Sequence, residues 1–325
     1  MAELKYWKAI NEALAEEMER DGTVVVVGED VGKPGGTYVA TKGLQERFGE
    51  RRVRDTPISE GIITGLATGA AMTGLRPVVE IMFMDFITLA SDQLVNHAAK
   101  VSWTSGGAFA VPMVLRTMSG AGRNTGPQHG QSLESWLAHI PGLKVAWPGN
   151  PADMKGLLKA AIRDPNPVVI IESLALWSVK GEVPNGDHVV PIGVANVVRA
   201  GEDVTVVAWG AAVRRAEAAA EVLAQDGVSA EVVDLRTLSP LDEATVLASL
   251  ARTGRLVVVH DAVGPYGGGA EIAALAAGPG FASLRAPVRR VTAPFAPVPF
   301  PPALERAYFP QVEDVVLACR DVVLA

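Results

Sequence analysis

The sequence predicts an α/β protein with two domains, each built on a parallel β-sheet. A chain of 325 residues is longer than one ordinary hydrophobic core requires. Short apolar runs alternate with segments of helical periodicity, which is typical of a parallel sheet covered by helices on both faces. Residues 180–191 interrupt this pattern with Gly, Pro and Asn and indicate a linker. We therefore expect one domain over residues 1–185 and a second over 192–325.

The first domain shows the alternation most clearly. Thr23 followed by four valines begins the expected strands, which are 23–27, 77–83, 111–116, 143–147 and 168–172. The expected helices are 4–19, 41–48, 59–74, 87–101, 132–139 and 151–163. In such sheets, ligands gather beyond the carboxyl ends of the strands. Polar residues that directly follow a strand, such as Glu29 and Asp30, are therefore candidates for a binding site.

The second domain repeats the pattern on a smaller scale. Its expected strands are 204–209, 229–234, 255–260 and 288–292, and its expected helices are 211–225, 242–251, 269–277 and 312–322. The glycine-rich segment 264–269 resembles a phosphate-binding loop but matches neither the dinucleotide fingerprint nor the P-loop. We interpret it as a flexible turn before a helix.

Composition and charge exclude several classes of function. The net charge of −7 offers no electrostatic basis for binding nucleic acid or an anionic membrane. Cys319 is the single cysteine, which excludes an internal disulfide framework, and its apolar neighbours predict a buried thiol. The longest weakly polar stretch, 61–75, is too short for a membrane span, and the N-terminus lacks a signal-peptide pattern. We expect a cytoplasmic protein.

Residues 55–74 are the most informative stretch. A polar turn containing a proline leads into a nearly uncharged helix that carries Glu60 at its start. Either the helix dipole favours this glutamate, or apolar neighbours hold its carboxyl at a raised pKa for proton chemistry. Gly61, Gly65 and Gly69 recur on one helix face, although glycine disfavours helix. Another backbone is therefore expected to pack closely against that face.

A second candidate lies in residues 119–131, a segment of thirteen residues with four glycines. Long loops without secondary structure inside a compact domain are usually functional. His129 ends this loop, just before a helix that Ser132 is expected to cap. The helix N-terminus would keep its imidazole neutral and ready to exchange a proton. Alternatively, His129 simply satisfies backbone groups. The other histidines have no ligand-like spacing, and no cysteine pair suggests zinc.

Several segments together resemble a known family over nearly the whole chain. They are 28–32, 54–60, 76–80, 128–129, 140–145, 161–164 with Pro167, and 233–238. The family is the β subunit of the thiamine-diphosphate-dependent component of 2-oxo acid dehydrogenase complexes. Segments 80–86 and 116–122 look most like the acetoin-cleaving members, followed by the pyruvate type. The resemblance implies a pyrimidine-binding fold in the first domain and a transketolase C-terminal-like fold in the second.

The resemblance also implies roles for individual residues. Glu60 would hydrogen-bond the aminopyrimidine ring of thiamine diphosphate and favour its imino tautomer, which activates the thiazolium carbon. Ile58, Met82 and Phe86 would line the aminopyrimidine pocket. His129 would orient the substrate or assist transfer of the acyl unit to lipoamide on an acyltransferase core.

Two metal ions follow from the same resemblance. A structural K⁺ would be held by backbone carbonyls, which suit a hard cation. These carbonyls belong to Met113, Ala161, Ile162, Asp164 and Asn166. The family also binds the diphosphate through Mg²⁺ on a Gly-Asp-Gly segment, and this chain contains none. We therefore expect an α subunit to supply that half of the site, most simply in an α2β2 heterotetramer.

The chain departs from the family pattern at three places. Gly130 follows the histidine where serine is usual, Gly61 stands where alanine is common, and segment 173–177 lacks the usual basic residue and tyrosine. Acetoin, pyruvate and branched-chain 2-oxo acids all remain open as substrates. Three other interpretations compete: a non-catalytic nucleotide- or flavin-binding subunit, a self-sufficient transketolase-like enzyme, and a degenerate scaffold subunit.

Overall fold

The computed structural model describes residues 1–325 and divides into two compact units. The first unit comprises Met1–Ser119 and Trp136–Ile192, and the second comprises Gly120–Ser135 and Gly193–Ala325. The division after Ile192 falls at the end of the expected linker. The segment Gly120–Ser135, which carries the predicted histidine loop, clusters with the second unit, although the sequence places it inside the span 1–185.

The first unit contains a sheet whose strands run in the order β6-β7-β5-β4-β2-β3, with every neighbouring pair parallel. The strands are β2 (Val24–Gly28), β3 (Val53–Asp55), β4 (Arg76–Phe83), β5 (Val114–Ser119), β6 (Lys144–Ala146) and β7 (Val168–Ser173). This confirms the predicted parallel sheet. The valine run of β2 is buried along its full length, as its central position requires.

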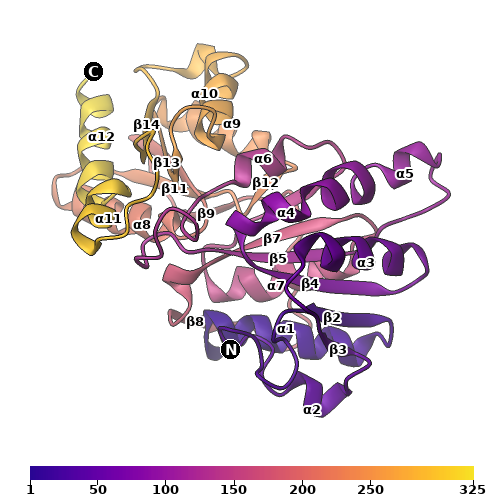
Figure 1. Ribbon diagram of the computed structural model, residues 1–325. Coiled ribbons are helices and arrows are strands. Elements are labelled where there is room, and N and C mark those ends of the chain that lie inside the picture. The colour runs from indigo at the N-terminus through magenta and orange to yellow at the C-terminus, as the bar shows by residue number, and fades with distance from the viewer. The chain divides into compact units, whose positions relative to one another are not determined.

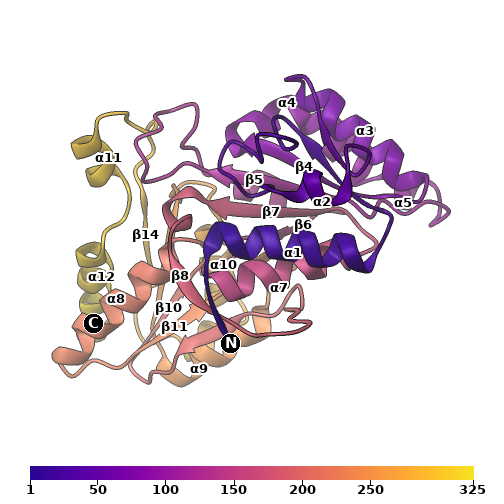
Figure 2. The same ribbon diagram turned by 90° about the horizontal axis from the view of Figure 1, so that it is seen from below.

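Helices cover both faces of this sheet. Helices α1 (Tyr6–Arg20) and α7 (Pro151–Arg163) lie side by side on one face, and α3 (Glu60–Met72) and α4 (Ile87–Asp92) cover the other (Figure 1). Figure 2 shows the α1–α7 face directly. The shorter helices are α2 (Leu44–Phe48), α5 (Val101–Thr104) and α6 (Glu134–Ala138). No helix in the chain has both the length and the apolar character needed to cross a bilayer.

Several local features of the first unit differ from the sequence prediction, and strand β3 was not predicted. The single helix expected over 87–101 is divided, because a π-helical turn (Gln93–Ala98) separates α4 from α5. The start of the expected linker is also structured. Strand β8 (Lys180–Val183) pairs antiparallel with β1 (Ala2–Lys5) in a two-stranded sheet.

The second unit has its own sheet, in the order β14-β13-β10-β11-β9, with only β9 antiparallel to its neighbour. The strands of this sheet are β9 (Asn196–Arg199), β10 (Val204–Ala208), β11 (Ala230–Asp234), β13 (Leu256–Val263) and β14 (Arg289–Ala293), and β12 (Thr237–Ser239) is not part of it. Its helices are α8 (Ala212–Gln225), α9 (Glu243–Thr253), α10 (Gly268–Ala277), α11 (Pro302–Tyr308) and α12 (Val312–Leu324). The sequence did not predict β9, β12 or α11.

Alternation along β10 explains the two layers of helices in this unit. Val204 and Val206 join the apolar cluster under α8 and α12, which also buries Cys319. Thr205 points to the opposite face, where its hydroxyl is 2.7 Å from the Ser249 hydroxyl of α9. Burial raises the pKa of the Cys319 thiol to about 12, which agrees with the predicted structural role.

A charged triad lies within the sheet of the first unit. The Arg116 guanidinium on β5 is 1% exposed and donates to Glu172 Oε1 on β7 at 2.7 Å and to Glu80 Oε2 on β4 at 2.9 Å. The two carboxyls outweigh the effect of burial and raise the pKa of Arg116. Burial, together with the charge of Glu80, raises the pKa of Glu172 to about 7 although Arg116 opposes this. A proton on Glu172 would leave the triad electrically neutral.

We predict that Arg116→Met lowers the free energy of unfolding by about 3–5 kcal/mol, because it leaves two carboxyls buried without a counter-charge. Urea denaturation of the purified chain measures this loss. The matched control is the double variant Arg116→Met/Glu172→Met, which removes one stranded carboxyl and should regain part of the stability. A double variant no more stable than Arg116→Met would contradict the assignment.

Candidate functional site

Glu60 lies where the sequence placed it, at the first turn of a helix beside the sheet. It is the first residue of α3, Ser59 is the N-cap residue, and the Glu60 side chain is buried, with the residue 7% exposed. Glu29 follows β2 at the same edge. Burial, and then the charges of Glu60, Asp30 and Glu80, raises the pKa of Glu29. The carboxyl edge of β2 and β4 therefore gathers several acids, and their charges disfavour the ionised form of Glu29.

Two of the three predicted pocket residues share one apolar cluster. Met82 and Phe86 are half-buried and pack on the buried side chains of Phe83, Met118 and Leu174. The rings of Phe83 and Phe86 meet edge to face with centroids 6.5 Å apart. Ile58 is outside this cluster, and its side chain is 81% exposed on the turn before α3.

Tyr38 and Trp177 extend the same cluster, and the sequence analysis did not select either of them. The Trp177 indole donates to the Tyr38 carbonyl at 2.8 Å, and the two rings meet edge to face at 5.9 Å. Trp177 belongs to segment 173–177, one of the departures from the family pattern. The structure gives that segment an aromatic packing role. In the sequence, the only sign of this packing was the presence of two isolated aromatic residues, Tyr38 and Trp177, outside the predicted helices and strands.

The loop that carries His129 belongs to the second unit and closes on itself. Thr125 Oγ1 is 3.1 Å from the Gly120 carbonyl oxygen and 3.0 Å from the His129 carbonyl oxygen. A Cβ at Gly120 would lie 2.0 Å from the His129 oxygen, so this closure requires glycine. His129 itself is half-buried at the end of the loop. We call residues 120–130 the histidine loop.

The predicted helix after His129 is shorter and begins later than expected. Helix α6 starts at Glu134, and the Ser132 hydroxyl is buried without a hydrogen-bond partner, so it does not cap the helix. His129 lies five residues before α6, whose dipole acts only within about one turn. The prediction that His129 lies at a helix N-terminus was therefore wrong.

A buried polar cluster in the second unit also escaped the sequence analysis. Glu134 is fully buried, and its carboxyl lies near the Trp209 indole and its own backbone amide. Burial, reinforced by the charge of Asp261, raises the pKa of Glu134 to about 7. Trp209 lies near this carboxyl and stacks on His260 with ring centroids 4.9 Å apart. Burial lowers the pKa of His260 to about 4, so the imidazole is neutral at pH 7.

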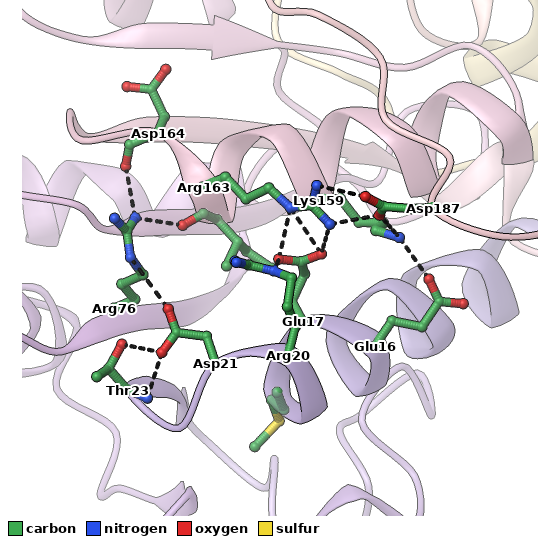
Figure 3. Close-up of polar contacts among 12 residues, drawn as sticks. Glu16, Glu17, Arg20, Asp21, Thr23, Arg76, Lys159, Arg163, Asp164 and Asp187 are labelled. Carbon is green, nitrogen blue, oxygen red and sulfur yellow. Dashed lines mark hydrogen bonds and ion pairs between the residues drawn. The ribbon is translucent and has the colours of Figure 1, made fainter.

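The carbonyls expected to bind K⁺ lie around the C-terminus of α7, and an arginine reaches two of them. Arg76 Nη1 donates to the Ile162 carbonyl at 2.8 Å and to the Asp164 carbonyl at 3.2 Å (Figure 3). Its Nε lies 3.7 Å from the Asp21 carboxyl. A cation at this position is favoured by the helix dipole, because α7 ends at Arg163.

Two of the remaining carbonyls accept backbone hydrogen bonds. Met113 O accepts from Val168 N at 3.0 Å, and Ala161 O accepts from Asp164 N at 3.2 Å. Each carbonyl oxygen has a second lone pair, so these bonds leave acceptor capacity for a monovalent cation. The donor set therefore fits K⁺, although any such ion would lie close to the charge of Arg76. No group of three or more His, Cys, Asp or Glu side chains is arranged to bind a metal.

Ion pairs hold the same end of α7 against α1. The Arg163 guanidinium pairs with Glu17 at 2.6 Å and with Asp187 at 2.6 Å, and Lys159 pairs with Glu16 at 2.8 Å (Figure 3). Glu17 and Lys159 are almost fully buried, so these pairs are screened less than exposed ones. They keep the helix end that carries the carbonyls in a defined position.

Comparison with known proteins identifies both domains. Residues 2–177 match the family model "Transketolase, pyrimidine binding domain", and residues 193–315 match "Transketolase, C-terminal domain". The chain is 46% identical to the acetoin:2,6-dichlorophenolindophenol oxidoreductase subunit beta of Cupriavidus necator, covering 96% of this chain and 95% of that protein. It is 44% identical to the pyruvate dehydrogenase E1 component subunit beta-2 of Oryza sativa subsp. japonica, covering 98% and 86%.

A third relative is the 2-oxoisovalerate dehydrogenase subunit beta of Bacillus subtilis, at 43% identity over 99% of both chains. The fold also matches a solved split-gene transketolase, described as an inactive beta4 tetramer, with a TM-score of 0.80 over 98% of this chain and 97% of that one. Sequence identity there is 24%, so this match concerns the fold alone. The chain belongs to the family of dehydrogenase β subunits built from these two transketolase domains.

Proposed function

We propose that the chain is the β subunit of a thiamine-diphosphate-dependent dehydrogenase component that acts in the cytoplasm. It would cleave acetoin or decarboxylate a 2-oxo acid and pass the acyl unit to the lipoamide of an acyltransferase. The buried Glu60 at the start of α3 carries this proposal, supported by relatives that are acetoin, pyruvate and 2-oxoisovalerate dehydrogenase β subunits. The two transketolase domain matches favour it over a nucleotide- or flavin-binding module.

The residues around Glu60 are suited to the pyrimidine half of the cofactor. The Glu60 carboxyl would exchange a proton with a ring nitrogen of the aminopyrimidine, at an edge already crowded with acids. Met82 and Phe86 would provide an apolar wall for the flat ring, and Ile58 would complete that wall from the turn. When bound, thiamine diphosphate supplies the carbon nucleophile that attacks the substrate carbonyl.

His129 would act on the substrate and not on the cofactor. It lies at the end of a closed loop that holds its backbone in place while its side chain remains partly accessible. An imidazole in this position can orient a substrate carbonyl or transfer a proton during acyl transfer to lipoamide.

We predict that substitutions at these two positions separate activation of the cofactor from the later steps on the substrate. Glu60→Gln should slow exchange of the thiazolium proton and abolish dye reduction with acetoin and with pyruvate. His129→Ala should leave that exchange near the wild-type rate but lower turnover by about 10²–10⁴-fold, as expected for a lost proton-transfer group. Proton NMR exchange and single-turnover assays on the enzyme co-expressed with its partner measure both effects. Wild-type exchange in Glu60→Gln would refute the role of Glu60.

One face of α3 supports the need for a partner subunit. Gly61 and Gly65 pack within the chain, since added Cβ atoms would meet the Leu89 carbonyl oxygen at 3.3 Å and the Gln93 side chain at 3.0 Å. These two glycines therefore form an internal seam with the segment that contains α4 and the π-helical turn. The neighbouring face exposes Ile62 and Leu66, and Ile58 on the turn before α3 continues the same spacing of four residues. We call Ile58, Ile62 and Leu66 the α3 stripe; they are 81%, 68% and 50% exposed.

We infer that the α3 stripe contacts the α subunit, which would supply the Mg²⁺ and diphosphate ligands. An apolar stripe beside Glu60 is costly to leave in water, and the cofactor site is incomplete without a second chain. Gly69 lies on the exposed part of α3 and has no atom within 4 Å of its added Cβ, so it leaves space for close approach. An α2β2 assembly would bury this surface.

We predict that Ile62→Glu prevents copurification with the α subunit while leaving the thermal unfolding of the isolated chain unchanged. A charge in an apolar interface is expensive, whereas the same charge on a free surface is not. Leu324→Glu is the control, because Leu324 is 86% exposed at the far end of the sequence. Normal copurification of the Ile62 variant would place the partner elsewhere.

We also propose that K⁺ binds the carbonyls of Met113, Ala161, Ile162, Asp164 and Asn166, beside Arg76. Carbonyl oxygens are the ligands that hard cations take. The cation would join Arg76 in neutralising the C-terminal end of α7. Its role would be structural, since it would stabilise the turn between α7 and β7.

We predict that this chain melts at a higher temperature in KCl than in choline chloride of equal concentration. Arg76→Met should lower the melting temperature and enlarge the K⁺ effect, because two carbonyls lose their hydrogen-bond donor. Thermal unfolding followed by circular dichroism measures both. Equal melting temperatures in the two salts, for the wild type and the variant alike, would refute the K⁺ site.

A further inference from the structure

The histidine loop rests on apolar groups from the C-terminal part of the second unit. Ala121 is buried in a cluster with Ala293, Val298, Tyr308 and Phe309. Farther along the loop, added Cβ atoms at Gly126 and Gly130 would meet Phe300 at 3.3 Å and Val298 at 3.2 Å. The loop backbone therefore packs closely on the segment before α11 and on the residues at the C-terminal end of α11.

One buried charge joins this packing. Glu305 of α11 is 3% exposed, and its Oε2 accepts a hydrogen bond from the Asn124 backbone N–H at 2.7 Å. The backbone of Asn124 is in the left-handed region, with φ of +56°, so the loop turns sharply there. The Glu305 carboxyl is almost fully buried, so the loss of this hydrogen bond is costly for the acceptor, although Asn124 itself is exposed.

The contact is connected to His129 through very few atoms. Thr125 follows Asn124 directly, and its hydroxyl is 3.0 Å from the His129 carbonyl oxygen. The backbone amide of His129 in turn lies 3.5 Å from the Gly126 carbonyl oxygen. A shift of the Asn124 amide would therefore move the residues that hold both backbone groups of His129.

We propose that Glu305 is a positioning residue for His129: its carboxylate anchors the turn at Asn124 and so sets where the imidazole meets the substrate. This inference rests on the proposed function of His129. Glu305 itself touches neither substrate nor cofactor. Misplacement of a catalytic group by about 1 Å can cost on the order of 100-fold in rate. The buried carboxyl of Glu305 on α11 thus holds a loop residue, Asn124, that lies 181 positions earlier in the chain.

The test compares Glu305→Met, which removes the acceptor at similar size, with Glu305→Gln, which keeps a carbonyl oxygen able to accept the bond. Both are made in the full chain co-expressed with its partner subunit. Glu305→Asp, whose carboxylate is one methylene shorter, replaces the Met variant if that one does not fold. Amide hydrogen exchange over residues 120–130, thiazolium proton exchange and single-turnover acyl transfer are measured for each.

We expect Glu305→Met to speed amide exchange in the histidine loop and to slow turnover about 10- to 100-fold, with thiazolium proton exchange unchanged. Glu305→Gln should resemble the wild type. In a His129→Ala background, Glu305→Met should slow turnover no further than about twofold, because both changes act on one group. Unchanged amide exchange, or a fully additive loss of turnover, would overturn the inference. If His129→Ala turned over substrate at the wild-type rate, the proposed role of His129 would be refuted. Amide exchange in Glu305→Met would still show whether Glu305 anchors the histidine loop.

Discussion

The buried triad of Arg116, Glu80 and Glu172 is the constraint on which the first unit depends. It joins the three adjacent strands β4, β5 and β7, with Arg116 and Glu80 near the middle of their strands and Glu172 near the end of β7. A guanidinium buried to this degree is tolerated only with carboxyl partners on both sides, so the register of the three strands is strongly specified. The same strands lead directly to Met82, to the histidine loop and to segment 173–177. The pairing of these buried charges therefore helps to determine where the residues of the candidate site lie.

Glycines let backbone segments approach each other closely at two places, because they lack a side chain. Gly120 permits the closure of the histidine loop, and Gly61 permits the seam between α3 and the Leu89 carbonyl. Helix α3 thus has two different faces. Its glycines pack inside the chain, whereas Ile62 and Leu66 remain exposed next to Glu60. A helix that is satisfied on one side and apolar on the other fits a subunit whose active site is completed by another chain.

Much of the fold and part of the site could be predicted from local sequence. Parallel sheets followed from valine-rich runs separated by amphipathic segments, and Glu60 was identified by its place at the start of an almost uncharged helix. Other features could not be predicted, because their signal is weak or not local. Strands β3 and β9 have three and four residues, too short for a clear period. The π-helical turn near Gln93 has no sequence signature, and Trp177 acquires a role only beside Tyr38.

The sequence by itself determined the fold class, the buried strands and the two candidate residues Glu60 and His129, because periodicity, glycine content and helix starts are properties of neighbouring residues. The tertiary structure alone decided that the histidine loop belongs with the second unit, that Arg76 reaches the carbonyls at the end of α7, and that Glu305 anchors Asn124. Each of these contacts joins residues at least 86 positions apart. The physical reason is that a buried hydrogen bond or charge acquires its partner only when distant segments fold against each other.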